Sequence, residues 1–173
     1  MIHFLDSEGV LHPDSAYLVK ARPALKSEGE PFMWAPLLAD VLADFPKSQL
    51  LLSPSWTRGL SFNRVRRWLP KKLCARVVGA TWHRARPFKR EVFRSLATGW
   101  DEATRCQKLK RYVGRAGLTD WVTIDDQLEG WGAEDRASWY ISITTPADLV
   151  LACWQCWRHA WKVLESQCHA SFS

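Results

Sequence analysis

Residues 1–13 have the sequence MIHFLDSEGVLHP, and the interpretation of this stretch depends on the rest of the chain. The apolar run 2–5 has the length of a short buried strand. It ends at Asp6, and a second acid follows two positions later at Glu8. Asp, Ser and Gly favour turns, so a solvated turn after a strand is one interpretation. The other is a reactive carboxylate at the carboxyl end of a parallel strand, where open α/β sheets bind their ligands.

Strand and helix patterns alternate along the chain. A polar, proline-containing stretch follows at about 12–31, and the apolar residues of 34–45 then recur at helical spacing. We expect further strands at about 49–53, 75–81, 120–126 and 139–144. We expect further helices at about 61–68, 103–113 and 146–166. This alternation is typical of βαβ units, so we expect an α/β fold with a mostly parallel sheet covered by helices on both faces.

Polar residues end three of the expected strands, namely Asp6, Ser53 and the pair Asp125–Asp126. The carboxyl ends of parallel strands share one edge of a sheet, so we expect these side chains to lie close together. The pair at 125–126 also fits a helix or turn cap, and Ser53 a simple strand-end hydroxyl. Three such coincidences at one edge nevertheless favour a site over unrelated turns.

Four stretches carry a family resemblance: FLDSEGVL (4–11), LLLSPSWTR (50–58), RVVGAT (76–81) and VTIDD (122–126). In this order they resemble the haloacid dehalogenase (HAD) superfamily of phosphohydrolases, in particular the compact HAD domains associated with RNA-repair proteins. The resemblance implies a Rossmann-like, HAD-type sheet with a minimal cap. We expect a single domain over 1–173 with a basic insertion at about 82–103 and a Trp-rich C-terminal helix at about 146–166.

By this resemblance Asp6 is the nucleophile of a phosphatase or phosphotransferase and forms an aspartyl-phosphate, an established form of carboxylate catalysis. The cofactor implied is Mg²⁺, a hard cation that prefers oxygen ligands. Its protein ligands would be Asp6, the backbone carbonyl of Glu8, and Asp125 or Asp126.

The resemblance also implies residues that bind the phosphoryl group. Ser53 would hydrogen-bond its oxygens and Arg105 would supply positive charge, with Lys108 as the alternative cation. Arg105 also fits a surface residue of a basic helix. Ser55 and Arg58 are further substrate-binding candidates, although Ser55 also fits a simple hydroxyl near a strand end. The family places its arginine directly after tryptophan, whereas one threonine separates the two here, so the role of Arg58 is open.

Glu8 is the main departure from the family pattern. The family has Asp at this position, where it serves as general acid and then as general base. Glu keeps the carboxyl chemistry, but its extra methylene displaces the group, and a misplacement of ~1 Å can cost about a hundredfold in rate. The sequence therefore leaves open an active enzyme, a slow one, or a catalytically impaired domain that binds nucleic acid or a protein partner.

Positive charge is concentrated in the middle of the chain. Residues 58–115 contain 17 Lys or Arg and three acids, whereas the whole chain has a net charge of +6, so the remainder is net negative. This favours a polyanionic or phosphorylated partner, with solvated helix faces as the alternative. Phosphorylated RNA or DNA ends are the expected substrate, and a small phosphorylated metabolite is the other candidate. The insertion would contact the nucleic-acid backbone through Arg84, Arg86, Lys89 and Arg90.

No apolar run approaches the roughly 18 residues of a membrane span, and no signal-like segment is present. The chain has five cysteines, an odd number that cannot all pair in disulfides, and no secretory signal accompanies them. We therefore expect reduced thiols, a cytoplasmic protein and no membrane association. The tryptophans of 146–166 fit either core packing or a partner surface, and the oligomeric state is open.

Overall fold

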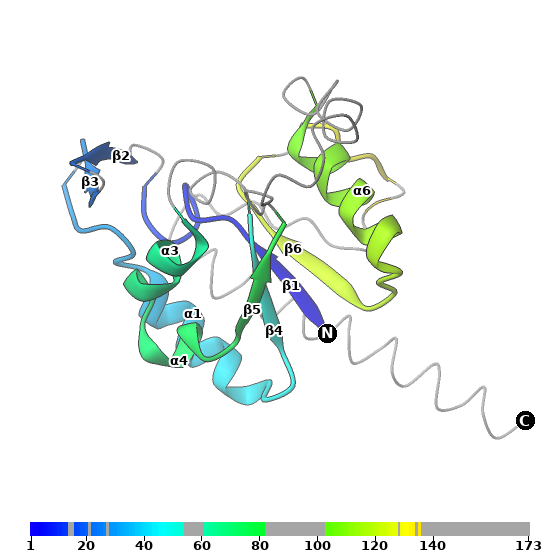
Figure 1. The fold of residues 1–173 in the computed structure, drawn as a ribbon, viewed down its shortest axis with the longest axis horizontal. Coiled ribbons are helices and arrows are strands. Elements are labelled where there is room, and N and C mark those ends of the chain that lie inside the picture. Colours follow the sequence, from blue (N-terminus) through cyan, green and yellow to red (C-terminus); the bar gives the residue numbers. More distant parts are fainter. Residues whose placement is uncertain are drawn as a thin grey trace, which may run out of the picture.

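The computed structural model describes residues 1–13, 16–20, 22–26, 28–53, 61–81, 103–127, 129–133 and 135. Its centre is a four-stranded sheet in which every neighbouring pair of strands is parallel (Figure 1). The strand order is β5-β4-β1-β6. The strands are β1 (Ile2–Leu5), β4 (Gln49–Leu52), β5 (Val77–Ala80) and β6 (Trp121–Ile124). The expected α/β fold with a mostly parallel sheet is confirmed.

Both faces of the central strand are buried, which explains its mostly apolar sequence. In β1, Phe4 pairs with Leu51 and belongs to a smaller apolar cluster that includes Leu109. The next residue, Leu5, pairs with Leu52 and belongs to a larger cluster on the opposite face. Successive side chains of a strand point to opposite faces, so the two clusters are the two sides of one sheet.

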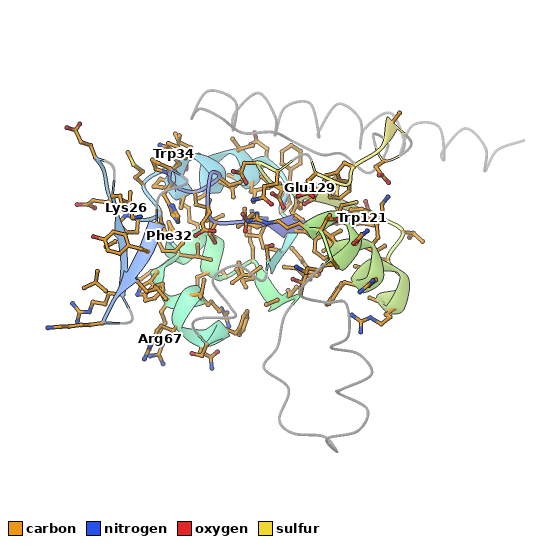
Figure 2. The ribbon with its side chains drawn as sticks, turned by 90° about the horizontal axis from the view of Figure 1, so that it is seen from above. Lys26, Phe32, Trp34, Arg67, Trp121 and Glu129 are labelled. Carbon is orange, nitrogen blue, oxygen red and sulfur yellow. The ribbon has the colours of Figure 1, made fainter. Side chains whose placement is uncertain are left out.

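Helices cover the two faces. The larger cluster is formed with α1 (Ala35–Val41), the 3₁₀ turn η1 (Leu42–Asp44), α3 (Phe62–Trp68) and α4 (Lys71–Cys74). The smaller one is covered by α6 (Arg105–Ala116), whose Tyr112 packs edge-on against Phe4 at 5.7 Å between ring centroids. Seen from above, Arg67 of α3 and Trp121 of β6 lie toward opposite sides of the molecule (Figure 2). Helices on both faces were expected and are confirmed.

Several boundaries differ from those predicted. The helix expected over 34–45 ends at Val41 and tightens into η1 shortly before Pro46, which cannot continue a helix. Pro70 ends α3 as expected, but α4 begins directly after it, because proline is tolerated at a helix start. The helix expected from 103 begins at Arg105 and extends to Ala116, where Gly117 in the left-handed conformation ends it.

An antiparallel hairpin of β2 (Ala16–Val19) and β3 (Arg22–Leu25) occupies the stretch that we expected to have no strands. It stands apart from the main sheet (Figure 1). Its turn contains Lys20 at φ 49° in place of the Asn-Gly signature of two-residue turns, and Pro23 lies inside β3. Because of these two features, the sequence pattern does not predict the hairpin.

The expected strand at 139–144, the helix at 146–166 and nearly all of the insertion at 82–103 lie outside the described residues. The single-domain boundaries therefore stay a prediction. Within the described part, no helix combines the length and the apolar character that crossing a membrane requires.

Candidate active site

The carboxyl ends of the four parallel strands form one edge of the sheet, and a polar residue follows each of them. Asp6 follows β1, Ser53 follows β4, Thr81 follows β5 and Asp125 follows β6. The backbone N–H groups of Asp6, Ser53 and Thr81 each donate to the last residue of a neighbouring strand, at 3.0, 2.8 and 2.9 Å. The sheet ladder thus continues one residue beyond the strands and holds these residues in register.

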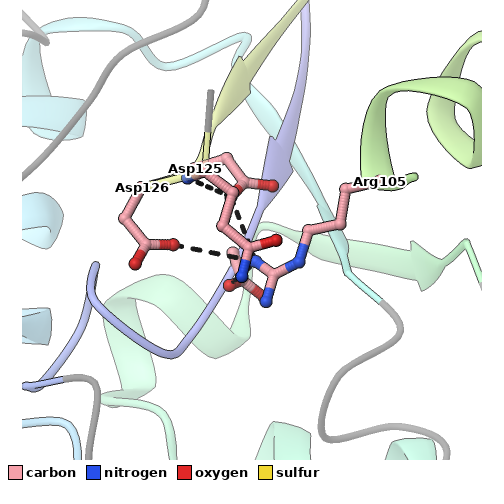
Figure 3. Close-up of polar contacts among 5 residues, drawn as sticks. Arg105, Asp125 and Asp126 are labelled. Atoms are coloured by element: carbon pink, nitrogen blue, oxygen red, sulfur yellow. Dashed lines mark hydrogen bonds and ion pairs between the residues drawn. The ribbon is translucent and has the colours of Figure 1, made fainter. Parts of the chain in front are cut away.

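Arg105 reaches this edge from the first residue of α6 (Figure 3). The helix begins there because Thr104 and Gln107 form a capping box, in which each side chain accepts a hydrogen bond from the other residue's backbone N–H. The Nη1 atom of Arg105 donates to the carboxylate of Asp6 and, at 3.0 Å, to that of Asp125. The same atom lies 3.8 Å from an oxygen of Asp126.

Burial makes the electrostatics of this cluster strong. Asp6 is 1% exposed and Asp125 is 2% exposed. Burial, followed by the charge of Asp6, raises the pKa of Asp125 to about 7, although Arg105 opposes the shift. Burial would lower the pKa of Arg105, but the charges of Asp6 and Asp125 outweigh it, so that pKa is raised and the guanidinium stays charged. Three carboxylates facing one guanidinium leave an excess of negative charge.

The carboxylates fit a bound divalent cation. Asp6, Asp125 and Asp126 each offer an oxygen, and these three atoms lie within 4.8 Å of one another. Carboxylate oxygens are the donors that Mg²⁺ prefers, and the excess negative charge favours a cation of charge two. The backbone N–H of Gln127 donates to Asp125 at 3.0 Å, which orients that carboxylate. The donor set is therefore compatible with the expected magnesium ion.

Gly9 lets the turn after β1 pass directly beside Asp126. Its φ is +67°, in the left-handed region that favours glycine. A Cβ atom at Gly9 would lie 2.9 Å from the Cβ of Asp126 and closer still to its carboxylate. Rotation of the Asp126 side chain cannot relieve this overlap, because its own Cβ is attached to the backbone. The close approach of the two segments therefore requires glycine.

A small pocket lies beside the carboxylates on the α6 side of the sheet. Its polar lining includes Ser53, Thr81, Arg105 and Lys108, so hydroxyl groups and cations border the same space. Charge-assisted hydrogen bonds of this kind suit the oxygens of a phosphoryl group. The lining residues are Phe4, Ser53, Thr81, Arg105, Lys108, Leu109, Thr123 and Asp125.

Six of the predicted site residues meet at this edge and pocket. Both acids of the 125–126 pair belong to the carboxylate cluster. Glu8 lies half buried in the turn after Asp6, and its carboxylate is not part of the cluster found among the described acids. The six are Asp6, Ser53, Arg105, Lys108, Asp125 and Asp126. The predicted residues outside the described part are Ser55, Arg58, Arg84, Arg86, Lys89 and Arg90.

Thr81 and Gly9 received no role in the sequence analysis. Thr81 follows β5 as Ser53 follows β4, so the same signal of a hydroxyl after a strand would have identified it. Gly9 stands beside Glu8 in the opening stretch, but its contact is with a segment more than a hundred residues later in the chain. No local pattern reports such a contact.

Comparison with known proteins gives one match. A family model described as the HAD domain in Swiss Army Knife RNA repair proteins matches residues 2–149. No curated protein and no solved structure matches the chain. The matched span contains every strand of the sheet and all three clustered carboxylates. This family implies a phosphohydrolase-type function in RNA repair. The chain belongs to the family of HAD domains found in Swiss Army Knife RNA repair proteins.

Proposed function

We propose that this chain is a Mg²⁺-dependent phosphatase or phosphotransferase that acts through an aspartyl-phosphate at Asp6, on phosphorylated nucleic-acid ends. One observation carries the proposal. Asp6 is buried at the carboxyl end of a central strand, in contact with Arg105 and clustered with two further carboxylates. The family supports the reaction class, and the basic middle of the chain supports a polyanionic substrate.

In the proposed reaction a carboxylate oxygen of Asp6 attacks phosphorus, and the bond between phosphorus and the leaving oxygen breaks. The carboxyl group of Glu8 donates a proton to that leaving oxygen. Glu8 then accepts a proton from the water that hydrolyses the aspartyl-phosphate, which restores Asp6 and releases phosphate. A phosphotransferase would use a hydroxyl group of a second substrate in place of water.

The pocket residues would hold the phosphoryl group during this transfer. Arg105 and Lys108 would offset its negative charge, and the hydroxyl groups of Ser53 and Thr81 would donate to its oxygens. Arg105 also contacts Asp6, so the same side chain would orient the nucleophile and the group that it attacks.

The metal ligands would be Asp6, the backbone carbonyl of Glu8, and one or both of Asp125 and Asp126. When bound there, Mg²⁺ would supply further neutralisation of the phosphoryl oxygens. The carboxylates would hold the cation at the edge of the sheet, beside the pocket proposed to bind the phosphoryl group.

The test measures phosphate release from an aryl phosphate and from 5′- and 3′-phosphorylated oligonucleotides, with Mg²⁺ and with chelator. We compare wild type with Asp6→Asn and with a matched control, Asp40→Asn, at an exposed acid on α1. Metal-dependent release should fall about a thousandfold or more in Asp6→Asn, as expected for a lost nucleophile, and should be unchanged in the control. Equal release by wild type and Asp6→Asn would contradict the proposal.

A second candidate function is a catalytically impaired domain that binds nucleic acid or a protein partner without turnover. The observation that favours it is Glu8, which is one methylene longer than the family's acid and lies outside the carboxylate cluster. If wild type releases phosphate from none of the substrates but still binds an oligonucleotide, this candidate replaces the first.

A further inference from the structure

Residues 61–81, which cover α3, α4 and β5, contain six basic residues and no acid. Three of the six have partners in the protein. Arg66 and Arg76 donate to backbone carbonyls at 3.2 and 2.6 Å, and Lys72 pairs with an acid of α1 at 3.4 Å. Arg66 and Arg76 thus help to hold the fold, whereas Lys72 takes part in an exposed ion pair.

Arg64, Arg67 and Lys71 are the other three. All are exposed, and none makes an ion pair or side-chain hydrogen bond to another residue within the described ranges. Arg64 and Arg67 are three residues apart in α3, so their side chains leave the same face of that helix. Val65 between them is 1% exposed and faces the core. Within the described ranges, the outer face of α3 therefore presents exposed positive charge without an acidic partner.

The β2–β3 hairpin offers an aromatic ring and a further cation. Tyr17 pairs with Ala24 and Val19 pairs with Arg22, so Tyr17 and Arg22 point to the same face of the hairpin. Tyr17 is 43% exposed and Val19, on the same face, is 45% exposed. The hairpin thus exposes a ring and a guanidinium together.

The hairpin and α3 lie on the same side of the molecule. Lys26, just after β3, and Arg67 of α3 are on one side in Figure 2, and Trp121 is on the other. Phe32, which follows the hairpin in the chain, packs against Trp68 at the end of α3, with ring centroids 6.2 Å apart. This contact ties the segment after the hairpin to the basic helix.

We infer that Tyr17, Arg22, Arg64 and Arg67 form a binding surface for single-stranded nucleic acid, here named the hairpin–α3 surface. Tyr17 stacks on a base, and the three arginines contact phosphates of the backbone. An exposed aromatic ring among cations is the arrangement that binds single strands without sequence preference. Arginine suits this role because its planar group matches the geometry of phosphate oxygens.

The position of α3 connects this surface with the site, and in this respect the inference rests on the proposed function. The helix follows β4 in a βαβ connection, so its first turn, which contains Arg64, lies toward the carboxyl ends of the strands. Asp6 and Ser53 lie at those same ends. A strand held by the hairpin–α3 surface would therefore approach the site with one of its ends.

The test measures binding of a fluorescent, unphosphorylated single-stranded RNA by anisotropy, at several salt concentrations. The probe lacks an end phosphate, so the result does not depend on turnover. The variants are Arg64→Gln/Arg67→Gln, Tyr17→Ala and Tyr17→Phe. The matched control, Arg111→Gln/Arg115→Gln, removes the same charge from exposed positions of α6. Thermal unfolding of each variant verifies that it is folded.

We expect Arg64→Gln/Arg67→Gln to weaken binding about tenfold or more and to reduce the salt dependence of log K by about 1.4, the value for two phosphate contacts with a single strand. Tyr17→Ala should weaken binding by about fivefold or more, from the loss of one stacked base, whereas Tyr17→Phe keeps the ring and the affinity. The α6 control should change the affinity by less than about threefold.

Three outcomes would overturn the inference. One is equal loss of affinity in the α3 and α6 double variants, since general charge would then explain the binding. Another is unchanged affinity in both the α3 double variant and Tyr17→Ala. The last concerns binding to anionic phosphatidylserine vesicles, measured with the same variants. If the α3 double variant and Tyr17→Ala lose vesicle binding but keep RNA binding, the surface binds lipid instead. If wild type binds RNA through this surface but releases no phosphate, the proposed function fails and the inference stands.

Discussion

Replacing Gly9 by alanine tests whether the opening turn and Asp126 depend on their close approach. Two costs can be worked out from the structure. Alanine at a φ of +67° costs roughly 1–2 kcal/mol, because its Cβ approaches the following carbonyl oxygen. The new Cβ would also lie 2.9 Å from the Cβ of Asp126, and an overlap that forces packed atoms apart costs about 1–3 kcal/mol. We therefore expect a total loss of about 2–5 kcal/mol.

The same substitution at Gly114 is the matched control. Gly114 lies within α6, its φ is not positive, and no neighbouring atom is within 4 Å of the Cβ that alanine would add. Alanine in a helix is more stable than glycine by roughly 0.5–1 kcal/mol, so Gly114→Ala should stabilise the protein. The two variants have identical chemistry and opposite predicted signs.

The assay is thermal unfolding in metal-free buffer and again with Mg²⁺. For a chain of this size 1 kcal/mol corresponds to about 2–4 °C in Tm, so Gly9→Ala should lower Tm by roughly 5–15 °C and Gly114→Ala should raise it by about 2 °C. Mg²⁺ should raise the Tm of wild type and of Gly114→Ala, because ligand binding stabilises the folded state. It should raise that of Gly9→Ala less, because Asp126 is displaced. A Gly9→Ala variant with the Tm and the Mg²⁺ response of wild type would refute the reasoning.

Three further predictions concern single side chains. Arg105→Met leaves three clustered carboxylates without their guanidinium, so it should cost about 3 kcal/mol of stability in metal-free buffer and less with Mg²⁺, as measured by urea unfolding; an equal loss in both buffers would contradict this. Burial, followed by the N-terminal charge, lowers the pKa of His3 to about 4, so the unfolded chain gains a proton there between about pH 6.5 and 4 that the folded chain does not. Protonation of His3 in the unfolded chain should thus lower the free energy of unfolding by roughly 3 kcal/mol as the pH falls through that window. His3→Gln should reduce the slope of that free energy against pH on the acid side by an amount equivalent to up to one proton. Glu8→Asp should lower turnover of an aryl phosphate by about ten- to a hundredfold if the site is built around the longer side chain, and a gain in turnover would instead show that Glu8 impairs the enzyme.

The sheet could be predicted because its strands are short, mostly apolar runs, and the central strand β1 is buried on both faces, as Phe4 and Leu5 illustrate. The cluster could be predicted because a parallel sheet brings the residues after its strands to one edge. Asp6 and Asp125 are far apart in the chain, yet their strands are neighbours. The strand order alone therefore predicts that the polar residues after three separate strands form one site.

The parts that could not be predicted depend on contacts that no local pattern reports. The hairpin turns at Lys20 and contains Pro23, so its stability comes from pairing and from the contact of its first strand with the core. The contact of Gly9 with Asp126 arises only after β1 and β6 have paired. The half-buried position of Glu8, outside the carboxylate cluster, also depends on how this turn is held.

The charges of the site and of the proposed binding surface predict an order of substrate binding. A phosphoryl group is negative, and at the edge of the sheet it meets three carboxylates that share one guanidinium. Like charges repel strongly in a buried site, so under the proposed function we expect a divalent cation to offset the carboxylates before a phosphoryl group enters. The three arginines of the hairpin–α3 surface are exposed, so attraction of a strand there would need no metal. Chelation should therefore abolish turnover and leave RNA affinity intact, whereas substitutions of Arg64 and Arg67 should weaken RNA binding equally with and without Mg²⁺.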